Sequence, residues 1–195
     1  MSGMEFRFDL GRLSLNFVAT VGSRCTPHPV ERLASPALLA EWLRESGVMP
    51  SKEPLPAIGQ KDLDAAIALR EVLYRLIHDI HHAREPDPAD IEFLNKAAQR
   101  AHPPVPQLQR GKKKNSWESK LLAPVTISQL LALIARDTID LLAGDDRTLM
   151  RECAGHACDG IYVDRSRGFR RQWCSSKTCG NQARVDRFRE KAAVQ

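Results

Sequence analysis

The chain has 195 residues, of which 27% are charged and 43% hydrophobic, and its formal net charge is +5. This length suits one ordinary domain, or one domain with a small appendage, and the composition is that of a folded chain. The sequence has no apolar run of the roughly 18 residues that a membrane span needs. The first residues, MSGMEFRFDLGR, lack the apolar core of a signal peptide. We therefore expect a cytoplasmic protein with no membrane partner, in which thiols stay reduced.

Positive charge is concentrated toward the carboxy-terminal end. Residues 147–195 hold 11 Lys and Arg against 5 Asp and Glu, whereas residues 1–146 carry a net charge of about −1. A near-neutral body with a basic tail favours a polyanionic partner for the tail. A basic face that only meets solvent is the alternative interpretation.

The amino-terminal segment begins with an alternating pattern. Phe6, Phe8 and Leu10 alternate with polar residues, which predicts a short half-buried strand that turns at Gly11. From Leu13 onward, the apolar spacing fits a helix and a second strand equally well, so both remain open.

A helix with clear ends follows. Ser35 is a favoured capping residue, Pro36 fits the first helical turn, and Gly47 favours the left-handed exit. Three prolines in residues 48–59 then predict a loop.

Residues 61–84 form the longest predicted helix, and its wide apolar stripe places it at the centre of the core. Asp87 and Pro88 predict the start of another helix, in which Ile91 and Leu94 are expected to pack inward.

The following segments predict a basic hairpin and one more helix. Residues 105–117 contain the turn-like run RGKKKN, which favours a β-hairpin, and residues 123–144 predict a helix that Gly144 ends. Residues 145–153 are expected to be extended. We place a domain boundary near Gly144–Thr148, which divides a helix-rich body with short strands from the basic tail.

The tail contains four cysteines in two equally spaced pairs. Four residues separate Cys153 from Cys158 and Cys174 from Cys179, with fifteen residues between the pairs. Two close pairs at this separation are typical of a tetrahedral zinc site. Four thiolates leave no open position for water, so the predicted zinc ion is structural and single. A redox dithiol or disulfides fit this spacing and compartment poorly.

The residues around the cysteines predict a small fold built on the metal. We expect strands at 161–164 and 170–173 around a turn, and a helix after Cys179 with Val185 and Phe188 facing inward. A turn that holds the first pair of ligands, then a hairpin, then a helix that carries the last ligands is the layout called a treble clef. Three aromatic residues are expected to cover the zinc ion, because so short a segment has little other core: Tyr162, Phe169 and Trp173.

These residues resemble a known family. CAGHAC, DRSRGFRRQWCSSKTCGNQ and the basic segment after them are similar to the CGNR zinc finger, which typically ends bacterial proteins that begin with an ABATE domain. GRLSLNFVAT and LREVLYRLI resemble ABATE segments, so the resemblance covers nearly the whole chain. It implies an α+β protein: a helix-rich ABATE-like domain with short β-hairpins over residues 1–146, and a treble-clef or zinc-ribbon-like finger over residues 147–195.

The resemblance also implies a function. The family is regarded as stress-response transcription regulators, with a finger that touches DNA and an ABATE domain that binds a small-molecule effector. The motif's fourth letter is Arg, and Gln182 stands there in this chain. If the motif's arginine contacts phosphate, this chain lacks one charge-assisted contact, for which nearby Arg184 is the candidate replacement.

DNA is therefore the partner that we expect, because Lys and Arg neutralise phosphates and release counterions. A protein-interaction module and an RNA-binding module remain alternatives, and the oligomeric state is open, a homodimer included. The basic candidates for nucleic-acid contact are Arg165, Arg167, Arg170, Arg171, Lys177, Arg184 and Arg187.

No enzyme is expected, since the sequence has neither a Gly-rich phosphate loop nor a nucleophile elbow. His78 and His82 share a helix face, but no glutamate lies between them as in a zinc protease, so a polar helix end is the preferred interpretation. Arg70 and Tyr74 share a face of the same helix and are candidates for lining a ligand pocket.

Overall fold

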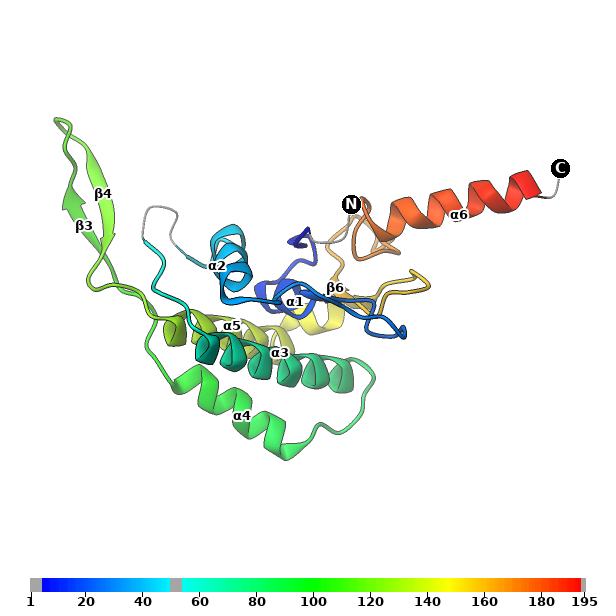
Figure 1. Ribbon diagram of the computed structural model, residues 1–195, viewed down its shortest axis with the longest axis horizontal. Coiled ribbons are helices and arrows are strands. Elements are labelled where there is room, and N and C mark those ends of the chain that lie inside the picture. Colours follow the sequence, from blue (N-terminus) through cyan, green and yellow to red (C-terminus); the bar gives the residue numbers. More distant parts are fainter. Residues whose placement is uncertain (1–4, 50–53, 194–195) are drawn as a thin grey trace.

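The computed structural model describes residues 5–49 and 54–193 and shows an α+β protein (Figure 1). A helical body lies at the centre, a β-hairpin projects from one end, and the last helix projects from the other. The helices are α1 (Leu13–Val18), α2 (Pro36–Glu45), α3 (Gln60–His81), α4 (Pro88–Gln99), α5 (Ile127–Ala143) and α6 (Cys179–Ala193). The predicted fold class, a helix-rich body with short antiparallel strand pairs, is confirmed.

Short strands form three antiparallel pairs within the described residues. The pairs are β1 (Val21–Gly22) with β2 (Val30–Glu31), β3 (Pro106–Arg110) with β4 (Trp117–Leu121), and β5 (Met150–Glu152) with β6 (Ile161–Val163). None of the helices in these residues is long and apolar enough to cross a membrane.

The long helix α3 organises the core, as its apolar stripe predicts. It packs against α1, α2, α4 and α5, so its buried face meets four neighbours. Leu73 on α3 and Trp42 on α2 are fully buried, and the Trp42 ring lies 4.9 Å from that of Phe17 on α1. A continuous core therefore joins the helices of the body.

Local capping explains where the helices begin and end. The Ser35 hydroxyl accepts a hydrogen bond from the backbone N–H of Leu38, and Gly47 has a φ of 72° in the left-handed region. Thr126 and Gln129 form a reciprocal capping box at the start of α5. The predicted loop after Gly47 includes residues 50–53, which lie outside the described residues.

Helix α4 confirms its predicted start and corrects one predicted core residue. The Asp87 carboxylate accepts a hydrogen bond from the N–H of Ala89, and Leu94 is buried. Ile91, however, is 41% exposed. The prediction that Ile91 packs inward was wrong because α4 packs mainly against α3 and α5, which cover a narrower face than the apolar pattern suggests.

The amino-terminal strand was also predicted incorrectly. Residues 5–10 form no ladder with another strand, and α1 begins at Leu13. Instead, Phe6 and Leu10 are buried, and the N–H of Val163 donates to the Leu10 carbonyl at 2.9 Å. The alternation of apolar residues reflects a segment that docks onto distant residues rather than a strand in a sheet.

The predicted basic hairpin is confirmed and is longer than expected. Its register runs from Pro106 opposite Leu121 to Arg110 opposite Trp117, so the second strand continues beyond the predicted end at residue 117. Every strand residue except Leu121 is exposed, which agrees with its projection away from the body (Figure 1).

The segment before the first cysteine is only partly extended. Asp145–Leu149 form a 3₁₀ helix, η1, and the Thr148 hydroxyl bonds to the Asp145 carbonyl within it. Extended structure begins at Met150, where β5 starts. The prediction of an extended segment was wrong for η1 because local hydrogen bonding by Thr148 favours a tight turn.

Substitutions on α4 test the assignment of its buried face. Leu94→Ala should lower the free energy of unfolding by about 2–5 kcal/mol, because it leaves a cavity in the core. Ile91→Ala on the exposed face should change it by about 0.5 kcal/mol. Urea denaturation of both variants checks this, and equal losses would contradict the assignment.

Candidate metal centre

The four cysteines of the tail converge on one point. Their sulfur atoms all lie within 4.8 Å of one another, with Cys174 Sγ 3.5 Å from Cys158 Sγ and 3.6 Å from Cys179 Sγ. A tetrahedral zinc ion with Zn–S bonds of about 2.3 Å places its sulfurs about 3.8 Å apart. The cluster therefore fits one zinc ion with four thiolate ligands.

Backbone turns bring the two pairs together. The N–H of Cys153 donates to the Gly160 carbonyl, and the N–H of Cys158 donates to the Gly155 carbonyl, which closes the first turn. A Cβ atom at Gly160 would lie 3.2 Å from Cys158 Sγ, so glycine allows this close approach. Cys179 is the first residue of α6, where the positive end of the helix dipole stabilises a thiolate.

The hairpin of this region is not the predicted one. Strand β6 pairs with β5, which precedes the first cysteine, and residues 170–173 form no strand. The Asp164 carboxylate instead accepts hydrogen bonds from the backbone N–H groups of Ser166 and Arg171, at 2.8 and 3.1 Å. These bonds hold the chain in a loop, so the hairpin brackets the first cysteine pair instead of following it.

The predicted aromatic cover is present only in part. Tyr162 is fully buried and Trp173 packs beside Gly180 near the second pair, but Phe169 is 56% exposed. Phe188 on α6 was expected to face inward and is 73% exposed. Both expectations were wrong because α6 and the loop before it project into solvent.

Arg7 is a residue of the site that sequence reasoning missed. Its Nη2 atom donates a hydrogen bond to Cys174 Sγ. Burial lowers the pKa of Arg7, but the negative charges of Cys174, Cys158 and Cys179 outweigh burial and raise it above its ordinary value. One zinc ion with four thiolates carries a charge of about −2, and the guanidinium offsets part of it. No spacing pattern links residue 7 to residue 174, so no sequence signal identifies this pair.

Two of the seven basic candidates hold the finger in place. Arg165 donates to the Asp146 carboxylate at 2.5 Å and to the Gly11 carbonyl at 3.0 Å. Arg171 donates to the carbonyls of Asp9, Trp173 and Cys174, and its guanidinium lies 4.4 Å from the centre of the Tyr162 ring. Both guanidinium groups therefore bind acceptors of the protein itself, although 51% of the Arg165 side chain is exposed.

The other five basic candidates are exposed: Arg167, Arg170, Lys177, Arg184 and Arg187. Arg184 reaches the Ser176 carbonyl at 3.3 Å, and the Arg187 guanidinium lies 6.0 Å from the Trp173 ring. Gln182, which replaces the motif's arginine, donates to the Asp186 carboxylate at 2.8 Å.

Arg70 and Tyr74 lie in different surroundings. Arg70 is 2% exposed and donates to Glu31 at 2.6 and 2.7 Å and to Glu71 at 2.9 Å. Tyr74 donates to Asp159 at 2.8 Å and lines a hollow of about 20 Å³ that Arg70 does not reach. Burial and this hydrogen bond raise the pKa of Tyr74 to about 12.

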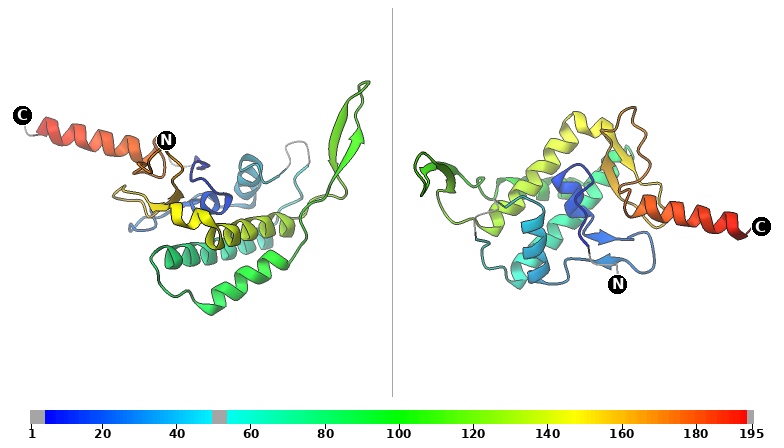
Figure 2. Two further views of the ribbon diagram at one scale, coloured as in Figure 1. Left: turned by 180° about the vertical axis from the view of Figure 1, so that it is seen from behind. Right: turned by 90° about the horizontal axis from the view of Figure 1, so that it is seen from above.

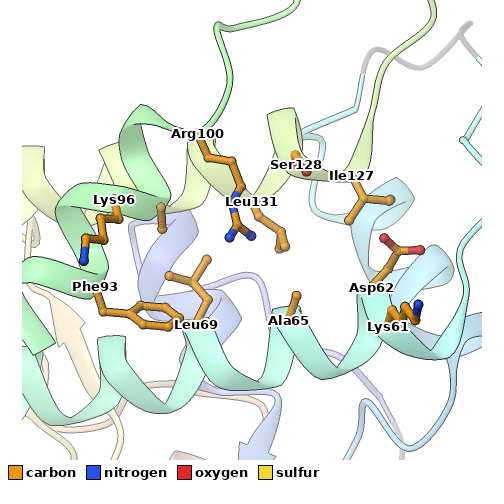
Figure 3. A pocket seen from close by; sticks show the side chains of 11 residues that line it. Lys61, Asp62, Ala65, Leu69, Phe93, Lys96, Arg100, Ile127, Ser128 and Leu131 are labelled. Atoms are coloured by element: carbon orange, nitrogen blue, oxygen red, sulfur yellow. The ribbon is translucent and has the colours of Figure 1, made fainter.

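A larger cavity of about 310 Å³ lies elsewhere in the body, between α3, α4 and α5 (Figure 3). Its lining combines apolar residues with three cationic side chains. The residues are Lys61, Asp62, Ala65, Leu69, Phe93, Lys96, Ala97, Arg100, Ile127, Ser128 and Leu131.

Replacing Arg7 tests its role beside the thiolates. Arg7→Met should weaken zinc binding by about 10- to 100-fold, since partners of metal ligands tune affinity by this amount. Competition with a chelator measures the change. Lys177→Met is the matched control, because Lys177 is exposed. Equal zinc affinity in both variants would show that Arg7 does not support the centre.

Comparison with known families agrees with this geometry. Residues 11–145 match the ABATE family, described as "Putative stress-induced transcription regulator", and residues 150–192 match the CGNR zinc finger. Neither description is that of an enzyme. A search of curated proteins found no match. Because the first match spans more than half of the chain, this protein belongs to the ABATE family and carries a CGNR zinc finger whose four cysteines could hold one zinc ion.

Proposed function

We propose that the protein is a transcription regulator that binds DNA through its zinc finger. The observation that carries this proposal is helix α6, which projects away from the body in every view (Figures 1 and 2). Its residues from Asn181 to Arg189 are exposed or half-buried, with none fully buried. A helix that leaves its apolar residue Phe188 exposed together with its arginines does not cover a core. It is free to meet a partner along its length.

The charge on this surface suits the DNA backbone. Arg184 and Arg187 lie on α6, Lys177 precedes it, and Arg167 and Arg170 lie on the loop beside Gly168. Cations of this kind position a protein on phosphates and give salt-sensitive affinity. We assign Arg165 and Arg171 to fastening the finger, because their guanidinium groups bind residues outside it: Gly11 and Asp146 for Arg165, and Asp9 for Arg171.

The zinc centre would act by orienting α6. Two of its ligands, Cys174 and Cys179, lie directly before and at the start of the helix, so the metal determines where the helix points. Arg165 and Arg12 both bind the Asp146 carboxylate, and this shared ion pair holds the finger against the body.

A protein-interaction or RNA-binding module is the alternative. Phe169 and Phe188 are large, exposed aromatic side chains next to the cationic surface, and such rings favour protein contacts or stacking on unpaired bases. Tighter binding to single-stranded RNA than to duplex DNA, or capture of a defined protein after nuclease treatment, would favour this alternative.

The arginines of α6 provide the test of DNA binding. The double variant Arg184→Ala/Arg187→Ala should bind duplex DNA more weakly, and the plot of log affinity against log salt should lose a slope of about 2, roughly one per phosphate contact. Mobility shifts of the zinc-loaded protein over a salt series measure both quantities.

Arg44→Ala on α2 is the matched control, since Arg44 is an exposed arginine on another helix. It should leave binding and slope unchanged. The proposal fails if the zinc-loaded protein binds no DNA at low salt, or if the double variant behaves like the control.

The same proposal includes an effector that binds in the body. In the cavity of Figure 3, the Arg100 side chain extends over a floor formed by Leu69 and Leu131. Lys96 is paired with Glu92, but among the described residues the Arg100 guanidinium has no hydrogen-bond or ion-pair partner. An apolar floor beneath an unpaired guanidinium suits a small amphipathic anion.

Octanoate and octanol are suitable probes, because they share a chain and differ in charge. Octanoate should bind more tightly than octanol, and Arg100→Met should remove the difference, whereas Arg84→Met, in the turn after α3, should retain it. Calorimetric titration measures the affinities. Equal affinity of the parent protein for both probes would contradict the effector site.

A further inference from the structure

A second group of metal-ligating side chains lies outside the four-cysteine centre. His78, His82 and Glu152 each offer one ligand atom, and these atoms all lie within 4.8 Å of one another. His82 Nε2 is 3.0 Å from the nearer carboxylate oxygen of Glu152. The spacing of the two histidines predicts that they lie on one helix face, but no sequence pattern predicts that Glu152 lies beside them.

The fold places these three side chains from two separate elements. His78 and His82 are four residues apart at the carboxy-terminal end of α3, so both imidazoles lie on one face of the helix. The N–H of His82 donates to the His78 carbonyl at 3.0 Å, which continues the helical geometry to the second histidine. Glu152 is the last residue of β5 and directly precedes the zinc ligand Cys153.

Neighbouring side chains hold His78 in position. Its side chain is buried, at 9% exposure, and its ring packs on that of Tyr74 with a centroid distance of 4.3 Å. The Tyr74 hydroxyl in turn donates to Asp159, in the turn between Cys158 and β6. One candidate ligand is therefore pre-organised, while His82 and Glu152 at the surface can adjust around an ion.

Two imidazole nitrogens and one carboxylate oxygen form a common ligand set for zinc and related ions, with a fourth position left to water. A simple ion pair between His82 and Glu152 accounts for two of the three groups. It does not account for the ligand atom of His78, which joins the same cluster from a buried ring.

We propose that His78, His82 and Glu152 bind a divalent first-row transition-metal ion, in addition to the zinc ion of the four cysteines. The ion would tie the end of α3 to β5, and so the helical body to the strand that leads into the finger. With three ligands, two of them exposed, this site should bind more weakly than the four-thiolate centre. It would therefore respond to metal concentrations at which the cysteine site stays filled. This proposal does not depend on DNA binding.

Zinc stoichiometry of the full-length, reduced protein provides the test. Equilibrium dialysis against micromolar zinc, followed by elemental analysis, should find a second zinc ion per chain in the parent protein. His82→Ala and Glu152→Gln should each bind only the first ion. Both substitutions are at exposed side chains, so they avoid the unfolding that a change at buried His78 risks.

His81→Ala is the matched control, because it removes a neighbouring histidine of α3 that is not in the cluster. It should retain the second ion. Thermal unfolding gives an independent readout: zinc beyond the first equivalent should raise the melting temperature of the parent protein and of the control but not of the two site variants.

Two results would overturn the proposal. The first is a parent protein that binds no zinc beyond the cysteine site. The second is a further ion that persists in His82→Ala and Glu152→Gln, which would show that other surface groups hold it.

Discussion

The mutual repulsion of four thiolates is the constraint on which the carboxy-terminal half of the structure depends. Sulfur atoms within 4.8 Å of one another are stable as anions only around a cation. A zinc ion would supply most of the compensating charge. The guanidinium of Arg7 and the amino-terminal end of α6 supply more from outside the metal shell. The path of the chain from Cys153 to Cys179 follows from this requirement.

The contribution of Arg7 also explains why the finger is not an isolated appendage. The segment from residue 5 to residue 12 runs along the finger, where the N–H of Val163 binds the Leu10 carbonyl and Arg171 binds the Asp9 carbonyl. Tyr74 on α3 reaches Asp159 in the finger as well. Helix α3, which lines the cavity of about 310 Å³, is therefore in direct contact with the region of the metal centre.

Local signals predicted the helices well, and packing decided the exceptions. Ser35, Asp87 and Thr126 cap their helices through hydrogen bonds within three residues, so neighbouring sequence suffices to place them. Ile91 and Phe188 have the spacing of inward residues, yet both are exposed because no element covers them. The strand predicted at residues 6–10 failed because this segment docks onto Val163, which lies far away in the sequence. The hairpin predicted at 161–173 failed because β6 pairs with the preceding strand β5, while Asp164 holds the following residues in a loop.

The sequence by itself determined the metal chemistry, because the spacing of Cys153, Cys158, Cys174 and Cys179 is a local property that any fold must accommodate. Only the tertiary structure decided how the charges around that metal are used. It engages Arg7, Arg165 and Arg171 within the protein and leaves the arginines of α6 in solvent. It also brings Glu152 to the histidines of α3. A charged group pairs with whichever opposite charge or acceptor lies near it in space. Residues so far apart in the sequence have no spacing pattern that predicts this proximity.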